Sequence, residues 1–573
     1  MIASALAAVA LVCPLAGCAP RRTAIAYPAG SEGGPPKRGG HAIFVREEDP
    51  DYLDPALSYG TYSAAVDEAL FHTLLDYDGV PGPAGAALHA DLAVSLPEVR
   101  EGGTLYAFRV RPDAKFGAPL HRHIVAADFK YAMERLFKVS SPSVAFYRRI
   151  VGAERALAGR DSVLPGVIAR GDSLYFRLTQ PDPTFIQVLS MPFTAPIARE
   201  MAEKYPGSMS QHTVATGPFQ VAEFVPRRRL LLVRNPDYCG TPAWLDTFEL
   251  RLGVTTTNGV ALIRRGQIDG GFFDLPAADF ARLRRDPYWS RQIDVADGLS
   301  TDYLFMNVRK PPFNDVRVRQ AISWAIDRRA VLKVWAGKGV TAGEFVPLGM
   351  PGARALHAYE GPDLPRARRL LAAAGYPHGF ETTLYGWTTH PGPLELTVIQ
   401  QQLAEVGIRA RLDLGESVGY TSMAQDTSRH IAFGIYQWTA DYPDPSNFFD
   451  TLLNGRRIAA LFNNDLSLFD DSHVNDAIER AMATADDSLR ARRWTDVDRA
   501  VMREAPIVTL THPYEARLYA PRLGGWYRHI TRILKLEDLY VKSAPPPPAL
   551  AAARASGERS VTPRPATARG TAR

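Results

Sequence analysis

Cysteine is nearly absent from this chain, and its scarcity limits the possible architectures. Among 573 residues only Cys13, Cys18 and Cys239 occur, and the first two belong to an uncharged N-terminal stretch. The rest of the chain therefore has one thiol and cannot form an intrachain disulfide. Cys-x-x-Cys pairs and the Cys/His spacings typical of zinc sites are also missing. We expect neither a metal site nor a cofactor.

Several catalytic signatures and long hydrophobic runs are missing as well. The sequence contains no His-Glu-x-x-His, no phosphate-binding P-loop and no Gly-x-Gly-x-x-Gly. These absences count against an enzyme, and we expect none. After Cys18 no run of 18 apolar residues occurs, which predicts that the mature body is soluble.

Positive charge is scarce in the body of the chain and concentrated at its ends. The formal net charge is +5. The excess comes from residues 19–38 and 543–573, which are rich in arginine, whereas the body between them is mildly acidic. The basic isoelectric point therefore does not indicate a nucleic-acid-binding body, and we expect no nucleic-acid partner.

The N-terminus has the features of an export signal. Residues 2–17 carry no charge, and the stretch ends in Leu15-Ala16-Gly17-Cys18. It is nearer in length to a signal h-region than to a spanning helix of ~20 residues. It resembles a bacterial lipoprotein signal, although no Lys or Arg precedes it. We expect residues 1–18 to be the signal and Cys18 to carry the lipid that anchors the protein in the cell envelope; the alternative is an ordinary apolar helix.

The remaining chain alternates strand and helix patterns between two low-complexity segments. Residues 19–38 are predicted to be a flexible tether and residues 543–573, which open with four prolines, a disordered tail. Strands are predicted at Ala42–Arg46, Leu105–Arg111, Leu174–Leu178, Phe219–Phe224 and Leu230–Arg234. Helices are predicted after Asn314 or Asp315, after Asp363, at Leu394–Val406, at His473–Ala485 and at Ser488–Glu504. This pattern indicates an α/β body with more than one lobe.

Ten segments in a fixed order resemble one family. They include Tyr52–Ala56, Leu70–Tyr77, Phe108–Phe116, Ala215–Phe219, Arg234–Tyr238, Pro311–Ala321, Ala367–Pro377 and Trp438–Pro445. Together they resemble the extracytoplasmic solute-binding proteins of ABC transporters, in the dipeptide- and oligopeptide-binding branch. The resemblance runs from Gly39 to about Lys542.

The resemblance implies an α/β, two-lobed periplasmic-binding-protein-like fold of type II, with an extra subdomain on the N-terminal lobe. We expect lobe I to comprise residues 39–75, 190–301 and 511–542, the extra subdomain residues 76–189, and lobe II residues 302–510. A ligand held between the lobes would favour the closed state, which a transporter would recognise.

The strongest candidate for ligand binding is Asp441. Its surroundings, Trp438-Thr-Ala-Asp441-Tyr-Pro-Asp444-Pro, place a carboxylate in an aromatic turn restrained by proline. The resemblance implies that this carboxylate binds the α-ammonium of a peptide; the alternative is an aspartate that only orders the turn. Asp444 is expected to form the turn.

Five further residues are weaker candidates for the ligand site. Trp438 is expected either to line a side-chain pocket or to pack in the core, and Tyr420 to form another pocket wall. Thr216 and Gly217 are candidates for backbone contacts, and Tyr303 for a position where the chain crosses between lobes.

The expected function is capture of a peptide or other small solute and its delivery to the permease subunits of an ABC importer, by a monomer at the periplasmic face of a membrane. Alternatives are the same fold binding a sugar, nickel or haem, or an exported hydrolase. His121 and His123 would supply only half a metal site. A binder that acts in signalling is also compatible with the sequence.

Overall fold

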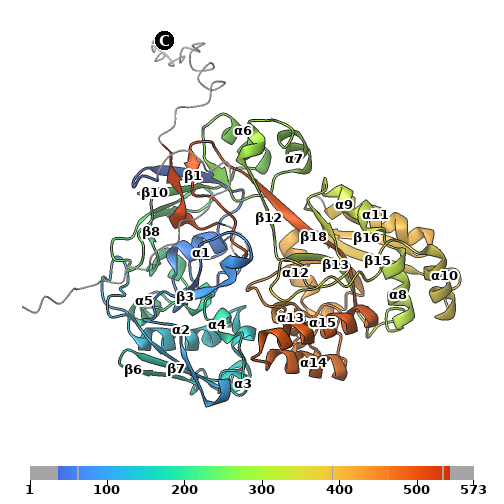
Figure 1. The fold of residues 1–573 in the computed structure, drawn as a ribbon, viewed down its shortest axis with the longest axis horizontal. Helices are drawn as coiled ribbons and strands as arrows, with labels where there is room; N and C mark the ends of the chain where they lie inside the picture. Colours follow the sequence, from blue (N-terminus) through green and yellow to red (C-terminus); the bar gives the residue numbers. More distant parts are fainter. Residues whose placement is uncertain (1–35, 61–62, 390–391, 461, 532–533, 543–573) are drawn as a thin grey trace, which may run out of the picture.

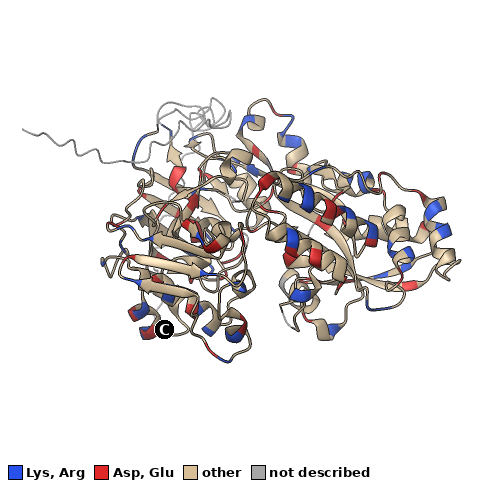
Figure 2. Ribbon diagram, turned by 60° about the horizontal axis from the view of Figure 1, so that its bottom comes forward, with Lys and Arg blue, Asp and Glu red and all other residues tan. Residues whose placement is uncertain are grey.

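A computed structural model describes residues 36–60, 63–389, 392–460, 462–531 and 534–542. The expected signal with Cys18, most of the expected tether and the expected tail lie outside these residues. The chain forms two halves joined by long strands (Figure 1). No helix of the described residues has the length and apolar character needed to cross a membrane. Acidic and basic side chains are interspersed over both halves (Figure 2).

Lobe I is built on a five-stranded sheet that contains the first strand of the described chain, while the last strand, β20 (Tyr540–Val541), pairs with β19 (Leu523–Gly524) in a separate sheet. Its strands, in sheet order, are β11 (Gly270–Gly271), β1 (His41–Val45), β10 (Thr247–Arg251), β9 (Arg229–Arg234) and β8 (Phe219–Val225). Strand β1 is parallel to β10 and β11, whereas β8 and β9 form an antiparallel pair. Alternate residues such as Phe44, Phe248 and Leu250 are fully buried, because one face of the sheet packs on the core. The helices of lobe I are α1 (Ala64–Leu70), α5 (Arg199–Lys204), α6 (Thr256–Arg264) and α7 (Ala277–Leu283).

The extra subdomain carries a four-stranded antiparallel sheet of its own. The strand order is β4 (Glu98–Arg100), β5 (Leu105–Arg109), β7 (Ser173–Arg177) and β6 (Val167–Arg170). Tyr106 and Phe108 are buried against α2 (Ala126–Lys138), whose apolar face covers the sheet. A short pair, β2 (Leu75–Tyr77) with β3 (Leu88–Ala90), links this sheet to lobe I, and the remaining helices are α3 (Ala153–Leu157) and α4 (Phe185–Val188).

Lobe II contains a seven-stranded mixed sheet. The path is β12 (Ile293–Asp297), β18 (Ile507–Leu518), β13 (Ser300–Met306), β17 (Phe433–Thr439), β15 (Glu381–Trp387) and β16 (Arg409–Gly415), with β14 (Gly339–Thr341) beside β18. Its helices are α8 (Val316–Ala325), α9 (Arg328–Val334), α10 (Leu364–Ala373), α11 (Gly392–Glu405), α12 (Ser417–Ala424), α13 (Ser446–Leu452), α14 (Ser472–Met482) and α15 (Asp487–Glu504).

Helix ends in lobe II follow the capping signals in the sequence. Asp315 accepts a hydrogen bond from the backbone N–H of Arg317, and Asp363 from that of Arg366, so each satisfies a free donor of the first turn. Gly375, just past α10, has φ of +92°, a conformation that glycine adopts without strain. The predicted strands and helices are confirmed, with shifts of one to three residues at their ends.

The two halves are joined where β18 changes partner. Its first part pairs with β13 and its last part with β12, so the chain crosses between lobes near residues 298–300 and 511–513. Lobe boundaries expected from the sequence, 301/302 and 510/511, fall inside β13 and β18. Close to this crossing the Thr301 hydroxyl and His512 Nδ1 are 3.0 Å apart. The crossing strands form the base of the space between the lobes.

Candidate functional site

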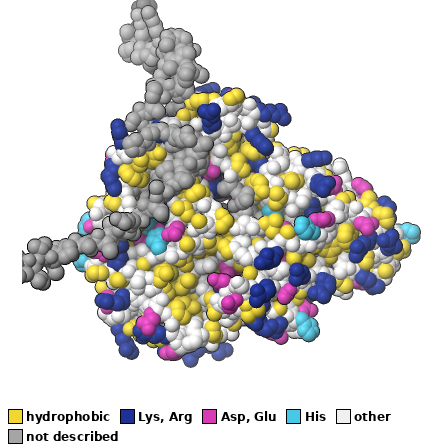
Figure 3. Space-filling view, viewed as in Figure 1, with side chains coloured by type: hydrophobic (Ala, Val, Ile, Leu, Met, Phe, Trp, Pro, Cys, Tyr) yellow, Lys and Arg dark blue, Asp and Glu magenta, His cyan; other side chains and the backbone are white. Residues whose placement is uncertain are grey.

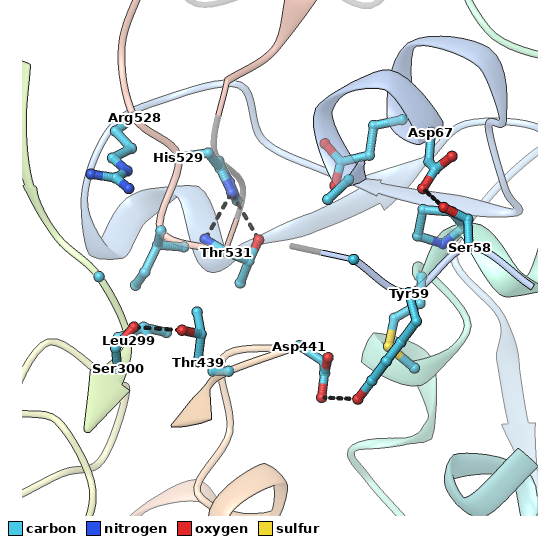
Figure 4. A pocket seen from close by; sticks show the side chains of 18 of the residues that line it. Ser58, Tyr59, Asp67, Leu299, Ser300, Thr439, Asp441, Arg528, His529 and Thr531 are labelled. Carbon is cyan, nitrogen blue, oxygen red and sulfur yellow. Dashed lines mark hydrogen bonds between the residues drawn. The ribbon is translucent and has the colours of Figure 1, made fainter. Parts of the chain in front are cut away.

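A cavity of about 130 Å³ lies between the two lobes, next to the crossing strands. Lobe I supplies Ser58, Tyr59, Asp67, Glu68 and the segment Arg528–Thr531. The crossing supplies Gly298–Ser300, and lobe II supplies Thr439–Asp441 at the end of β17. Figure 4 shows these side chains converging from chain segments that are hundreds of residues apart.

Asp441 lies in the wall of this cavity and is held by neutral donors. Asn447 Nδ2 donates to Asp441 Oδ2 over 2.9 Å, and the Tyr59 hydroxyl donates to the same oxygen over 3.4 Å (Figure 4). No lysine or arginine of the described residues forms an ion pair with this carboxylate. Burial raises the pKa of Asp441 to about 6, and the two hydrogen bonds oppose part of that rise.

The cavity as a whole is acidic. Its lining includes Asp67, Glu68, Asp441 and Glu515, whereas Arg528 is the one lysine or arginine among the lining residues, and it is paired with Glu515. Burial raises the pKa of Asp67 well above its usual range, and the Ser58 hydroxyl donates to Asp67 over 2.6 Å. The pKa of about 6 leaves Asp441 largely ionised at neutral pH. The field at the cavity favours a cationic group near Asp441.

Trp438 supports Asp441 from behind rather than lining the cavity. Its side chain is 7% exposed and packs in the core of lobe II. The indole N–H donates to Asn447 Oδ1 over 2.9 Å, and the same oxygen accepts the backbone N–H of Asp441 over 3.0 Å. Asn447 thus ties β17 to α13 and fixes the carboxylate. Of the two roles considered for Trp438, the structure places it in the core.

Asp444 orders the turn, as expected. Its Oδ1 accepts the backbone N–H of Ser446 over 2.9 Å, and the carboxylate is buried 3.8 Å from Arg490.

The other residues predicted for the site lie away from the cavity. Tyr420 is 1% exposed, and its hydroxyl donates to the Ile435 carbonyl over 2.6 Å behind β17. Tyr303 is buried on β13. The Thr216 hydroxyl donates to the His72 carbonyl, and Gly217 packs so tightly that a Cβ would meet the Ala69 carbonyl at 2.7 Å. Tyr420 on α12, Tyr303 on β13 and the loop residues Thr216 and Gly217 are thus packed inside the lobes and do not line the cavity.

Sequence reasoning missed the lobe I half of the cavity. Tyr59 reaches Asp441 across 382 positions of sequence, and His529 lies opposite with its Nε2 2.6 Å from the Gly85 carbonyl. Ser300 and Thr439 share a hydrogen bond of 2.8 Å across the crossing (Figure 4). Neither Tyr59 nor His529 stands in a distinctive local pattern, so only the tertiary fold reveals them.

The expectation that the chain contains no Gly-x-Ser-x-Gly signature of a hydrolase is wrong, because one stretch of lobe II has this spacing. Residues 415–419 read Gly-Glu-Ser-Val-Gly and join β16 to α12. Ser417 is exposed, starts α12 with an ordinary negative φ, and forms no side-chain hydrogen bond with any histidine or acid of the described residues. A nucleophile elbow needs a strained backbone and an adjacent base, so this match does not support catalysis.

The described part of the chain contains no cluster of side chains suited to a metal ion. No group of three His, Cys, Asp or Glu side chains there is arranged to hold an ion. His121 Nδ1 instead lies 2.7 Å from Asp237 Oδ2 at the surface.

Residues 87–460 match the family described as "Bacterial extracellular solute-binding proteins, family 5 Middle". The chain is 24% identical to the Heme-binding protein A of Haemophilus influenzae over 84% of its length and 89% of that protein. It is 26% identical to the Dipeptide-binding protein of Escherichia coli K12 over 82% of its length and 89% of that protein. The Periplasmic oligopeptide-binding protein OppA of Salmonella typhimurium is 26% identical, over 86% of this chain and 90% of that protein.

Solved structures share the architecture. The Clavulanic acid biosynthesis oligopeptide binding protein 2 superposes with a TM-score of 0.84 and 26% identity, covering 90% of this chain and 98% of that one. A Helicobacter pylori DppA in complex with the peptide STSA superposes with a TM-score of 0.77 and 23% identity, covering 88% and 99%. The fold is therefore the type II periplasmic-binding-protein fold.

Proposed function

Because the chain belongs to the bacterial extracellular solute-binding proteins of family 5, we propose that it binds peptides with a free amino terminus between its lobes and delivers them to an ABC importer. One observation carries the peptide assignment. Asp441 presents a carboxylate to the interlobe cavity with neutral donors only, so its charge is free to pair with a ligand ammonium.

The energetics favour an ammonium at this place. A charge-assisted hydrogen bond to a carboxylate contributes roughly 1.5–3 kcal/mol where bulk water is excluded. An arriving cation also relieves the desolvation that raises the pKa of Asp441 to about 6. Relatives named as dipeptide- and oligopeptide-binding proteins are consistent with a ligand that carries such a group.

The same contact accounts for closure of the lobes. Asp441 belongs to lobe II and its donor Tyr59 to lobe I, so a ligand held at the carboxylate touches both lobes. A ligand with greater affinity for the closed state shifts the population toward it. The closed protein is then the form that the permease recognises.

The remaining parts of the proposal concern the cell envelope. We propose that residues 1–17 are removed, that Cys18 then carries a lipid as the new terminal residue, and that the monomer works in the periplasm. The motif Leu15-Ala16-Gly17-Cys18 supports this assignment.

The test is calorimetry with tri-alanine and its N-acetyl derivative. We expect tri-alanine to bind at least about tenfold more tightly, since acetylation removes the positive charge that Asp441 pairs with. Equal affinity for the two peptides would remove the assigned role of Asp441. Binding of a neutral sugar in place of any peptide would overturn the peptide assignment.

A further inference from the structure

A second and larger cavity lies between the extra subdomain and lobe II, on the far side of Asp441. Its volume is about 580 Å³. We call it the apolar chamber because hydrophobic side chains dominate its lining. They are Phe137, Val144, Phe146, Leu157 and Val188 from the subdomain, and Tyr442, Phe462 and Met482 from lobe II. The space-filling view shows hydrophobic side chains gathered on the side of the molecule that holds the subdomain (Figure 3). Such a volume, lined mainly by apolar groups at a domain interface, is typical of a ligand pocket.

The charged side chains in the lining already have partners within the protein. Arg148 Nε lies 2.9 Å from Glu154 and Arg149 Nη2 lies 2.7 Å from Glu479. Asp450 is 3.1 Å from Arg457, and Asp182 is 3.6 Å from Arg149. A charged ligand group would have to displace one of these pairs, whereas an apolar group only displaces water from apolar walls. The chamber is therefore suited to an uncharged, hydrophobic part of a ligand.

An aromatic partition separates the chamber from the Asp441 cavity. The rings of Tyr59 and Phe146 are 6.5 Å apart, and those of Phe146 and Tyr442 are 6.2 Å apart. Both outer rings of this partition adjoin Asp441: the Tyr59 hydroxyl donates to its carboxylate, and Tyr442 directly follows Asp441 in the chain. A group attached one carbon away from a bound ammonium would thus meet this partition first. Phe146 is half-buried and packs at the edge of the subdomain core.

We propose that the apolar chamber receives the side chain of the ligand's first residue and selects large hydrophobic ones. This inference rests on the proposed binding of a peptide ammonium by Asp441. Phenylalanine, leucine or tryptophan would enter past Phe146, while aspartate and lysine would be excluded because the chamber has no unpaired counter-charge among its lining residues.

The experiment compares Phe-Ala-Ala with tri-alanine by calorimetry. We expect wild-type protein to bind Phe-Ala-Ala about tenfold or more tightly, given the gain from burying a phenylalanine side chain. In Val144→Trp, whose new ring fills the chamber, the ratio of the two affinities should fall to about two or less. Leu157→Glu should also lower this ratio. Because Leu157 is a more exposed wall position, this second variant tests the chamber with less risk of a folding defect.

The matched control is Val99→Trp, which adds the same ring at an exposed position of β4 in the same subdomain and should leave the ratio unchanged. A wild-type ratio near one, or a ratio that survives both chamber variants, overturns the chamber proposal. If tri-alanine still binds more tightly than its N-acetyl derivative in that case, the proposed function stands without it. If neither peptide binds, both proposals fail together.

Discussion

The two cavities on either side of the turn at Asp441 differ in how their charges are balanced. In the smaller one the carboxylate of Asp441 has hydrogen bonds from Asn447 and Tyr59 but no cation among the described residues. In the larger one the charged side chains of the lining are matched by counter-charges, as in the 2.7 Å pair between Arg149 and Glu479. A desolvated charge without a partner is a place for a ligand charge, whereas a paired charge mainly holds protein segments together.

The difference also concerns which parts of the molecule each cavity connects. Tyr59 and Asp441 join lobe I to lobe II beside the crossing strands, and Arg149 and Glu479 join the subdomain to α14. The Gln180 side chain donates to the same Glu479 oxygen over 3.1 Å. The first contact lies at the carboxylate proposed to bind the ligand, whereas the second ties the subdomain to lobe II.

The largest expected effect comes from removing the unbalanced charge. Asp441→Asn keeps the shape of the side chain but not its charge, so affinity for tri-alanine should fall by about 30-fold or more, equivalent to about 2 kcal/mol. Isothermal titration calorimetry measures this. Asp444→Asn, in the same turn, is the control: its carboxylate caps the turn and should alter affinity by less than about threefold. Similar losses in both variants would mean that the turn, not the charge, matters.

A second effect follows from the pKa of Asp441. Burial raises it to about 6, so the carboxylate is mostly ionised at pH 7 and mostly protonated at pH 5. Affinity for a peptide ammonium should therefore fall about tenfold between pH 7 and pH 5. Fluorescence or calorimetric titrations at both pH values test this. The Asp441→Asn variant should lack this part of the pH dependence, and an unchanged wild-type affinity would contradict the ionisation of Asp441 as its cause.

A smaller effect is expected from breaking an ion pair beside the larger cavity. Glu479→Gln removes the charge that pairs with Arg149 between lobe II and the subdomain. Loss of this pair should weaken the closed state relative to the open one. Ligand affinity should drop by about threefold although residue 479 does not line either cavity. Small-angle scattering should show a more open average shape. Glu101→Gln breaks an exposed pair with Arg177 inside the subdomain and should change neither; an equal effect there would refute the closure argument.

The smallest effect should come from Tyr59→Phe. The hydrogen bond it removes is long, 3.4 Å, and Asn447 still holds the carboxylate, so affinity at pH 7 should change by about twofold or less. Because that bond lowers the pKa of Asp441, its loss should move the midpoint of the pH profile to higher pH. A shift to lower pH would show that Tyr59 does not donate to Asp441.

The sequence alone indicated much of the scaffold. Asp315 and Asp363 cap their helices as predicted, since capping depends on residues two or three positions away. Alternating apolar residues such as Tyr106 and Phe108 likewise identified strands, because the side chains of a strand alternate between its two faces. Asp441 also stood out, because the aromatic residues and prolines that surround it are its neighbours in the chain.

Tertiary structure alone decided the walls of both cavities. Trp438, a candidate for a pocket wall, packs in a core, while Tyr59 and Phe146, which the sequence did not single out, stand beside Asp441 and Tyr442. Pairing of Arg149 with Glu479 spans 330 positions. Local patterns reflect interactions between neighbours in sequence, whereas a cavity forms where distant segments meet, and no short pattern records which segments those will be.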